Sequence, residues 1–191
     1  AYQRLVPKQL LKNLNKESIL DVQLGDQVQK EMSIVFSDIR SFTSLSEKMS
    51  PEKNFEFINT YLSKMGPIVR NNHGYIDKYI GDSIMALFDR SAEDAVRTSV
   101  NMLDSLREYN KERIAEGDDI IQIGIGVNTG EMMLGTLGES DRMEGSVISD
   151  AVNLAARLES LTKLYKTPLL LSETTLLKIE KNLFQTRLID K

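Results

Sequence analysis

The apolar residues of this chain fall into short blocks whose period changes, and each change marks the boundary of a predicted element. A continuous apolar run over residues 32–36 predicts a buried strand that ends at Asp38. Over residues 55–69 the apolar positions recur at helical spacing. Ser50 followed by Pro51 is typical of a helix start, so we predict a helix that begins there and ends before residues 71–74.

The remaining blocks predict the other elements in the same way. Gly81 permits a tight turn, so the apolar blocks at 75–79 and 83–88 predict the two strands of a hairpin. Helical spacing over residues 92–115 and 148–162 predicts two longer helices. The other expected elements are a short helix at 41–49, paired strands at 121–127 and 132–137 joined by a turn at 128–130, a polar loop at 139–145, a strand at 168–171, a short helix from residue 172 and a final strand at 184–189.

This order of elements predicts the fold class. Strands and helices alternate, with hairpins embedded between helices, which is typical of an α+β fold whose helices cover a mostly antiparallel sheet. The simplest match is a ferredoxin-like core with split βαβ topology. We predict one domain over residues 28–191. A helical linker or signalling appendage precedes it over residues 1–27, where leucines form a short amphipathic stretch.

Composition narrows the classes of function. The net charge of -4 argues against a nucleic-acid partner, but a nucleotide substrate stays open because metal ions neutralise phosphates locally. The chain has no cysteine and one histidine, which excludes disulfides, thiolate zinc sites and a histidine cluster within one chain. The absence of cysteine suits the cytoplasm, where we expect the protein. No apolar run approaches the ~20 residues that span a bilayer, so we expect no membrane segment in this chain.

Two aspartates stand at positions suited to metal binding. Asp38 ends the first predicted strand, and Asp82 lies at the tip of the following hairpin. Mg²⁺ prefers carboxylate oxygens and tolerates bound phosphates, while the N–H groups that open the helix after Asp38 favour phosphate. Taken singly, each aspartate is more often a helix cap or a turn residue. The positions alone therefore leave both interpretations open.

Four motifs together give a resemblance to a known family. They are FSDIRSFT at residues 36–43, KYIGDSIMA at 78–86, GIGVNTG at 124–130 and DAVNLAAR at 150–157. In this order they resemble motifs of the class III adenylyl and guanylyl cyclases of the bacterial and cyanobacterial type. The resemblance implies the nucleotide cyclase fold and a head-to-tail homodimer whose active sites are shared between the two subunits.

The resemblance also assigns a role to each matching residue. Asp38, the backbone of Ile39, and Asp82 would hold two Mg²⁺ or Mn²⁺ ions per active site. Asn153 and Arg157 of the second subunit would orient the ribose and stabilise the transferring phosphate. They lie four positions apart and share a helix face, which in isolation is typical of a solvated surface. The backbone that would meet the phosphates belongs to Ile39, Arg40, Ser41, Phe42 and Thr43.

Lys78 and Ser146 occupy the two base-recognition positions of the family. An ammonium only donates hydrogen bonds, and adenine N1 accepts one whereas guanine N1 carries a hydrogen. Guanylyl members resemble this motif but carry an acidic residue where Lys78 stands. Members that use adenine usually have Asp or Thr at the position of Ser146. A serine hydroxyl both accepts and donates, so we expect weaker discrimination between the bases.

The resulting hypothesis is an adenylyl cyclase that converts ATP to 3′,5′-cyclic AMP and pyrophosphate. The alternatives are a catalytically silent cyclase-like module that binds nucleotide or dimerises, and a guanylyl cyclase, which Lys78 opposes. Family members place a further phosphate-binding lysine in a hairpin beyond Ile189, and the chain stops at Lys191, so we expect reduced activity of this fragment. The appendage resembles the linker to an upstream sensor domain in a longer parent protein.

Overall fold

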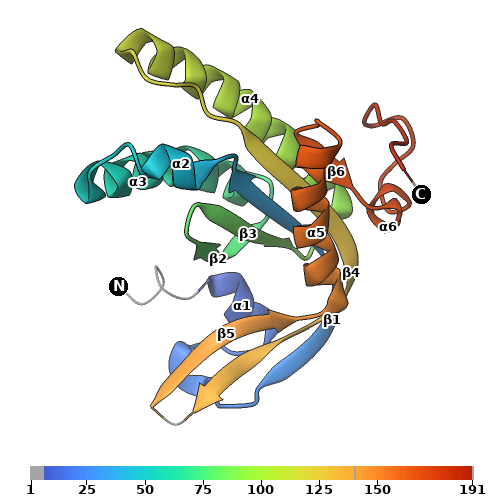
Figure 1. The fold of residues 1–191 in the computed structure, drawn as a ribbon. Coiled ribbons are helices and arrows are strands. Elements are labelled where there is room, and N and C mark those ends of the chain that lie inside the picture. Colours follow the sequence, from blue (N-terminus) through green and yellow to red (C-terminus); the bar gives the residue numbers. More distant parts are fainter. Residues whose placement is uncertain (1–6, 140, 191) are drawn as a thin grey trace.

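The computed structural model of the protein describes residues 7–139 and 141–190 (Figure 1). Every helix predicted after residue 40 has a serine as its N-cap. At the starts of the three long helices the serine side chain accepts a hydrogen bond from a backbone N–H of the first turn; these serines are Ser50, Ser91 and Ser149. The helices are α1 (Lys8–Asn13), the short 3-10 helix η2 (Ile19–Asp21), α2 (Phe42–Ser46), α3 (Pro51–Asn71), α4 (Ala92–Glu116), α5 (Asp150–Leu164) and α6 (Glu173–Leu176).

The strands form one sheet. They are β1 (Gln27–Ile39), β2 (Tyr75–Ile80), β3 (Ser83–Phe88), β4 (Ile123–Glu139), β5 (Arg142–Ile148) and β6 (Leu169–Leu171). The order is β2-β3-β1-β4-β5, all antiparallel, and β6 pairs in parallel with β4. The predicted α+β fold with a ferredoxin-like core and a mostly antiparallel sheet is confirmed.

Three predictions about the second half of the chain are wrong. Residues 121–137 are not a hairpin, because β4 runs without a turn and pairs with β1 from Ile123 to Gly135. Its true hairpin partner is β5, which begins within the predicted polar loop at 139–145 and runs on to Ile148. The segment 184–189 is not a strand, since none of the described strands pairs with it.

Close packing explains the glycines that suggested a turn in β4. A Cβ on Gly126 would lie 2.2 Å from the carbonyl oxygen of Ala155 and 2.3 Å from the amide nitrogen of Glu159. The amide of Asn128 donates to the carbonyl of Ala151 at 2.9 Å. Helix α5 therefore packs directly on the backbone of β4. A larger side chain at Gly126 would hold the helix away from the strand.

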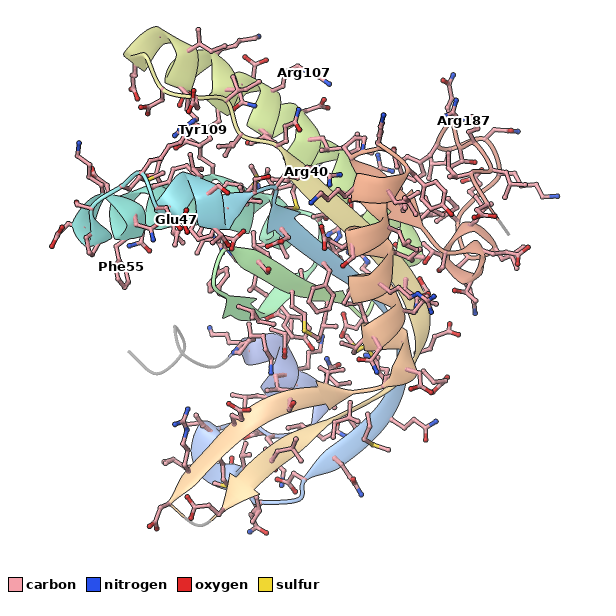
Figure 2. All side chains as sticks on the ribbon, viewed as in Figure 1. Arg40, Glu47, Phe55, Arg107, Tyr109 and Arg187 are labelled. Atoms are coloured by element: carbon pink, nitrogen blue, oxygen red, sulfur yellow. The ribbon has the colours of Figure 1, made fainter. Side chains whose placement is uncertain are left out.

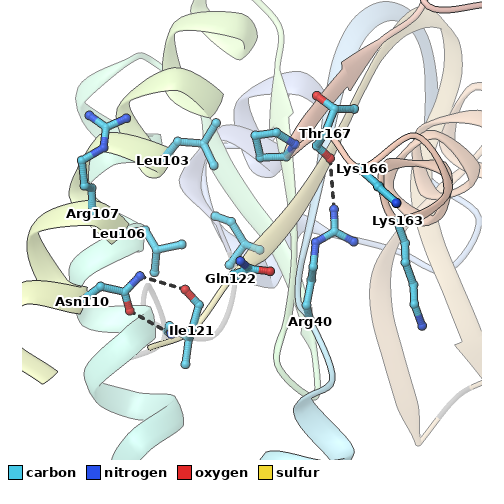
Figure 3. Close-up of a pocket in the computed structure, with 12 residues that line it drawn as sticks. Arg40, Leu103, Leu106, Arg107, Asn110, Ile121, Gln122, Lys163, Lys166 and Thr167 are labelled. Atoms are coloured by element: carbon cyan, nitrogen blue, oxygen red, sulfur yellow. Dashed lines mark hydrogen bonds between the residues drawn. The ribbon is translucent and has the colours of Figure 1, made fainter. Parts of the chain in front are cut away.

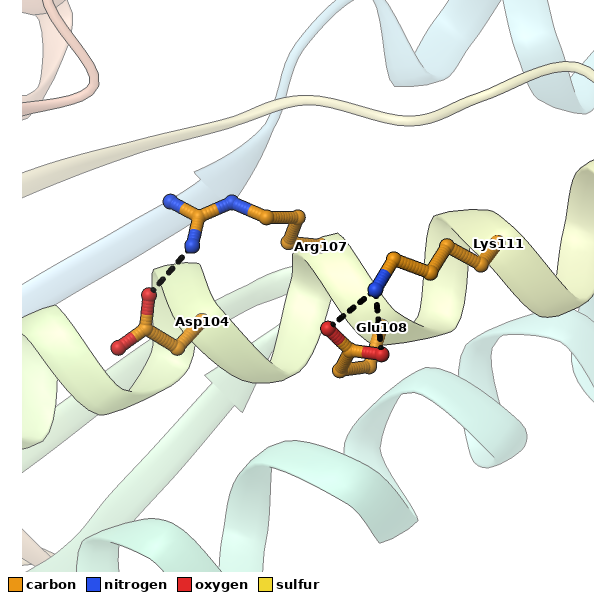
Figure 4. Close-up of polar contacts among 4 residues, drawn as sticks. All are labelled: Asp104, Arg107, Glu108 and Lys111. Carbon is orange, nitrogen blue, oxygen red and sulfur yellow. Dashed lines mark hydrogen bonds and ion pairs between the residues drawn. The ribbon is translucent and has the colours of Figure 1, made fainter.

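The two faces of the sheet have separate cores. Val35 and Ile39 of β1 face a cluster that α3 and α4 cover, whereas Met32 and Ile34 face a second cluster with α1 and α5. The solvent side of α4 carries exposed ion pairs between residues three apart, Asp104 with Arg107 at 3.0 Å and Glu108 with Lys111 at 2.8 Å (Figure 4). Such pairs stabilise a helix weakly, so burial of the opposite side holds α4 in place.

Helix α1 packs onto the sheet, although it belongs to the range predicted as a linker. Leu10 and Leu14 are buried in the second cluster. Leu10 lies against Gly145 of β5, where a Cβ would come within 2.2 Å of it, and Asn13 donates to the hydroxyl of Tyr75 of β2 at 3.5 Å. The helix thus joins β2 to β5 across this face of the sheet (Figure 1). No described helix is long and apolar enough to cross a membrane.

Candidate active site

The structure brings Asp38 and Asp82 together, as predicted. Asp38 is the penultimate residue of β1, and Asp82 lies at the tip between β2 and β3, where Gly81 has a positive φ of 63°. The backbone N–H of Ile39 donates to Asp82 at 3.0 Å. The hydroxyl of Ser83 donates to Asp38 at 2.6 Å. These two bonds fix the carboxylates beside each other at one corner of the sheet.

The electrostatics of this pair favour a cation. Partial burial, contact with the Asp38 carboxyl and the charge of Asp38 raise the pKa of Asp82 to about 7, against the opposing effect of the Ile39 N–H. Burial and the charge of Asp38 also raise the pKa of Glu159 on α5, while Arg40 opposes this rise. The positive charge nearby therefore does not fully neutralise the acidic groups at this corner of the sheet.

The donor set fits Mg²⁺ or Mn²⁺. Two carboxylates and the neighbouring carbonyl of Ile39 are hard oxygen ligands, and such ions complete their shells with water and substrate phosphates. Among the described residues no group of three or more His, Cys, Asp or Glu could hold a metal ion. Any ion at Asp38 and Asp82 would therefore take its remaining ligands from water and from a phosphate-bearing substrate.

The backbone predicted to bind phosphate is only partly available. The N–H of Ile39 is bound to Asp82, and that of Arg40 donates to the carbonyl of Gln122 at 2.8 Å. Ser41 adopts a left-handed conformation, with φ 56°, and α2 begins directly after it. The N–H groups of Phe42 and Thr43 open that helix, so these residues keep free donors of the kind that phosphate needs.

The guanidinium of Arg40 turns away from the carboxylate pair. Figure 2 shows Arg40 between the end of β1 and α5. Its guanidinium donates to the hydroxyl of Thr162 at 2.9 Å and to the carbonyl of Thr167 at 3.0 Å, at the end of α5. These bonds tie the end of β1 to the end of α5. Arg40 also lines a hollow of about 600 Å³ bounded by α4, the start of β4 and the segment after α5 (Figure 3).

That hollow is distinct from the carboxylate pair. Arg40 is the one predicted site residue that lines it, together with Lys163, Lys166 and an apolar floor that includes Leu103. Asn110 closes one end by holding the backbone of Ile121 through two hydrogen bonds of 2.8 and 2.9 Å. The carboxylates of Asp38 and Asp82 do not line this hollow, and both are partly exposed.

The other predicted residues lie apart from the carboxylates. Asn153 and Arg157 are exposed on α5, on the side that points away from β4, and no described hydrogen bond or ion pair involves their side chains. Lys78 is on β2 opposite Met85, and Ser146 is on β5 opposite Gly135. Within one subunit, no described contact joins either residue to Asp38 or Asp82.

Three residues near these groups were not predicted from the sequence. Ser83 binds Asp38, and Glu159 acts on the same carboxyl through its charge. Asp77 lies beside Lys78, with 3.7 Å between its Oδ2 and the lysine Nζ. Ser83 was within reach of sequence reasoning, since it directly follows Asp82. Asp77 and Glu159 were not, because only the bulge in β2 brings Asp77 to Lys78 and only the packing of α5 on β4 brings Glu159 close.

Comparison with known proteins decides the family. A model of the adenylate and guanylate cyclase catalytic domain matches residues 24–190. The chain belongs to this cyclase family. The cyclase domain is 39% identical over 197 residues to an adenylate cyclase of Anabaena cylindrica, a match that covers 100% of this chain and 39% of the relative. The chain therefore spans about two fifths of the length of that relative.

Solved structures agree on the fold and differ in the base. A bacterial light-regulated adenylyl cyclase superimposes with a TM-score of 0.84 at 28% identity, over 94% of this chain and 53% of the other. The guanylyl cyclase Cya2 superimposes with a TM-score of 0.71 at 34% identity, over 79% of each chain. Membership of the cyclase family thus leaves the choice between adenine and guanine to the residues of the site.

Proposed function

We propose that this cyclase domain converts ATP to 3′,5′-cyclic AMP and pyrophosphate, as a homodimer whose active sites combine residues of both subunits. The observation that carries the proposal is the pair of Asp38, near the end of β1, and Asp82, at the tip of the hairpin that also bears Lys78, which are fixed side by side. The name of the Anabaena cylindrica relative supports the same activity.

In the proposed reaction the ribose 3′-oxygen forms a bond to the α-phosphorus, and the bond from that phosphorus to the bridging oxygen of pyrophosphate breaks. The 3′-hydroxyl passes its proton to solvent water as it attacks, and pyrophosphate departs with the electron pair of the broken bond. Ions bound to Asp38, Asp82 and the carbonyl of Ile39 would supply Lewis-acid stabilisation of the attacking and leaving oxygens. The N–H groups of Phe42 and Thr43 would donate to phosphate oxygens.

The second subunit would complete the site. Arg157 is permanently charged and offers planar donors to the α-phosphate, where negative charge gathers during transfer. Asn153, one helical turn earlier, would hold the ribose so that the 3′-oxygen faces the phosphorus. Both side chains are exposed in the single subunit and free to meet a substrate held by the other one. Such a site exists only in the dimer.

Base selection is assigned to Lys78 and Ser146. Lys78 offers only donors, which suit N1 of adenine and oppose the N1–H of guanine. Ser146 would accept from the adenine amino group, although its hydroxyl can also donate to guanine O6. We therefore expect ATP to be preferred, with some turnover of GTP.

Subunit complementation tests the proposal. Asp82→Ala and Arg157→Ala, each inactive alone, would restore one intact site in every mixed dimer. An equal mixture should recover roughly a quarter of the wild-type rate with ATP and Mn²⁺, because half of the dimers are mixed and each holds one intact site. Activity in either variant alone would refute the assigned roles. Two inactive variants that fail to complement, beside an active wild type, would refute the shared site.

The nucleotide and the protein concentration give the remaining tests. Turnover of ATP that rises faster than linearly with protein concentration is the expected result for a dissociating dimer. Preference for GTP would replace the adenylyl assignment with a guanylyl one. Binding of ATP without product, in a chain that also includes the hairpin expected beyond Ile189, would favour a silent nucleotide-binding module instead.

A further inference from the structure

Asp77 is a buried carboxylate directly before the base-recognition residue Lys78. Its side chain is only 2% exposed, and its Oδ2 has no hydrogen-bond partner among the described residues. Leaving a buried charge without compensation is costly, so a carboxylate in this position needs a cation nearby. The ammonium of Lys78, 33% exposed, supplies it at 3.7 Å from Oδ2.

A β-bulge makes this meeting possible. In a regular strand neighbouring side chains point to opposite faces, so Asp77 and Lys78 would be kept apart. Here the register with β3 shifts between Ile76, which pairs with Ala86, and Lys78, which pairs with Met85. Asp77 is the extra residue of the bulge, and bulges redirect side chains in this way. The carboxylate and the ammonium therefore come together.

The surroundings of Asp77 offer it no second counter-ion. Among the described residues, burial raises the pKa of Asp77 and the charge of Glu144 on β5 adds to this rise, whereas the charge of Lys78 opposes it. The pKa of Tyr75 is raised chiefly by its burial and also by the charge of Asp77. Lys78 is thus the group on which the buried carboxylate depends, and the attraction acts equally on the lysine.

We propose that Asp77 is a positioning residue, which holds the ammonium of Lys78 where it meets the adenine base. This inference rests on the proposed function, because it assumes that Lys78 donates to adenine N1. The separation of 3.7 Å is an ion pair and not a hydrogen bond, so the ammonium keeps its three N–H donors for the base and for water. The attraction restricts a long flexible side chain before substrate arrives, which lowers the entropy lost on binding.

The Asp77→Asn variant isolates this role. Asparagine keeps the shape of the side chain and removes the charge that holds Lys78. A matched control is Asp89→Asn, which removes another lysine-paired carboxylate, 3.1 Å from Lys30, at the end of β3. Asp77→Ser serves as a second variant without the amide group, and melting temperatures establish that all variants fold.

The test compares ATP with 1-deaza-ATP, in which a C–H replaces N1. In wild type we expect kcat/KM to favour ATP, because 1-deaza-ATP cannot accept from Lys78. In Asp77→Asn this preference should fall about tenfold, the effect of one charge-assisted hydrogen bond, mainly through a higher KM for ATP. The preference should stay unchanged in Asp89→Asn. A merely structural role of Asp77 would lower turnover of both nucleotides alike and leave the ratio intact.

A second measurement does not need turnover. The side-chain ¹⁵Nζ signal of Lys78 should report an ordered ammonium in wild type and a more mobile one in Asp77→Asn, in the absence of nucleotide. An unchanged ratio and an unchanged signal in Asp77→Asn would overturn the inference while leaving the adenylyl assignment in place. Equal use of ATP and 1-deaza-ATP by wild type would instead remove the base-reading role of Lys78, and the inference with it.

Discussion

The hairpin of β2 and β3 carries two aspartates, Asp77 and Asp82, whose surroundings differ in the source of positive charge. Asp77 is buried in the strand and meets the ammonium of the next residue in the chain. Asp82 lies at the tip, partly exposed, and faces another carboxylate, Asp38. The backbone N–H of Ile39 donates to Asp82.

This difference separates two uses of the same side chain. A carboxylate neutralised from within the chain holds its cation in place and offers little to a ligand. A pair of carboxylates without a neighbouring cation destabilises the fold until a cation binds from solution. The pair must stay accessible to solvent for that cation to bind. The first arrangement suits positioning of a side chain, and the second suits binding of a metal ion with its substrate.

The largest expected effect comes from removing one carboxylate of Asp38 and Asp82, the tip pair. Asp38→Ala and Asp82→Ala should each lower kcat by a hundredfold or more, roughly the cost of losing one main electrostatic group of an active site. The measurement is cyclic nucleotide formation with saturating Mn²⁺. Asp89→Asn, at the other end of β3, is the control and should keep most of the activity. Retained activity in either alanine variant would refute the metal assignment.

The tip pair was predictable from the sequence. The ion pair of Asp77 and Lys78 within β2, the strand site, was not. Asp38 ends a visible apolar run, and Asp82 follows a glycine that marks the turn, so both fall at recognisable positions of the pattern. The bulge that redirects Asp77 leaves no such mark, because one extra residue in a short strand does not disturb its composition. Only the pairing with β3 reveals it.

The errors in the second half of the chain have a related cause. Asn128 and Gly130 are typical turn residues, yet they lie in the middle of β4. They lie where α5 packs on this strand. The helix approaches the backbone closely at Gly126, and Asn128 donates a hydrogen bond to the carbonyl of Ala151. A local pattern cannot distinguish a residue that allows a turn from one that allows close approach of a helix.

A charge reversal at Lys78 sharpens the comparison. In Lys78→Glu the acceptor suits the N1–H of guanine, and the ratio of kcat/KM for ATP to that for GTP should fall by roughly a hundredfold. The same change leaves Asp77 buried without a counter-ion and beside a second carboxylate. We therefore expect low stability in Lys78→Glu and recovery in the double variant Asp77→Asn with Lys78→Glu. Melting temperature and product analysis by chromatography measure both effects.

The outcome separates the two roles of Lys78. A double variant that is no more stable than Lys78→Glu would show that Asp77 does not depend on the lysine. A stable double variant that still prefers ATP would show that the lysine does not select the base. Neither result bears on the carboxylate pair at the tip.

The smallest expected effect is the pH dependence of stability without metal. The pKa of Asp82 is raised to about 7, so the folded chain binds this proton more tightly than the unfolded chain. The stabilisation is present in full below the unfolded pKa of 3.8 and is lost as the pH rises towards about 7. In EDTA, the melting temperature should therefore fall from about pH 5 to about pH 8, and less so in Asp82→Asn.

The difference between wild type and Asp82→Asn should be about 2–4 °C at the upper pH, since solvent screens a partly exposed group. Mn²⁺ should remove this difference by stabilising wild type alone. In Asp77→Asn the response to Mn²⁺ should match that of wild type, because the strand site takes its cation from Lys78. If Mn²⁺ stabilises Asp82→Asn as much as wild type, the metal binds elsewhere. The tip pair would then not be the metal site, and the contrast between the tip pair and the strand site would be refuted.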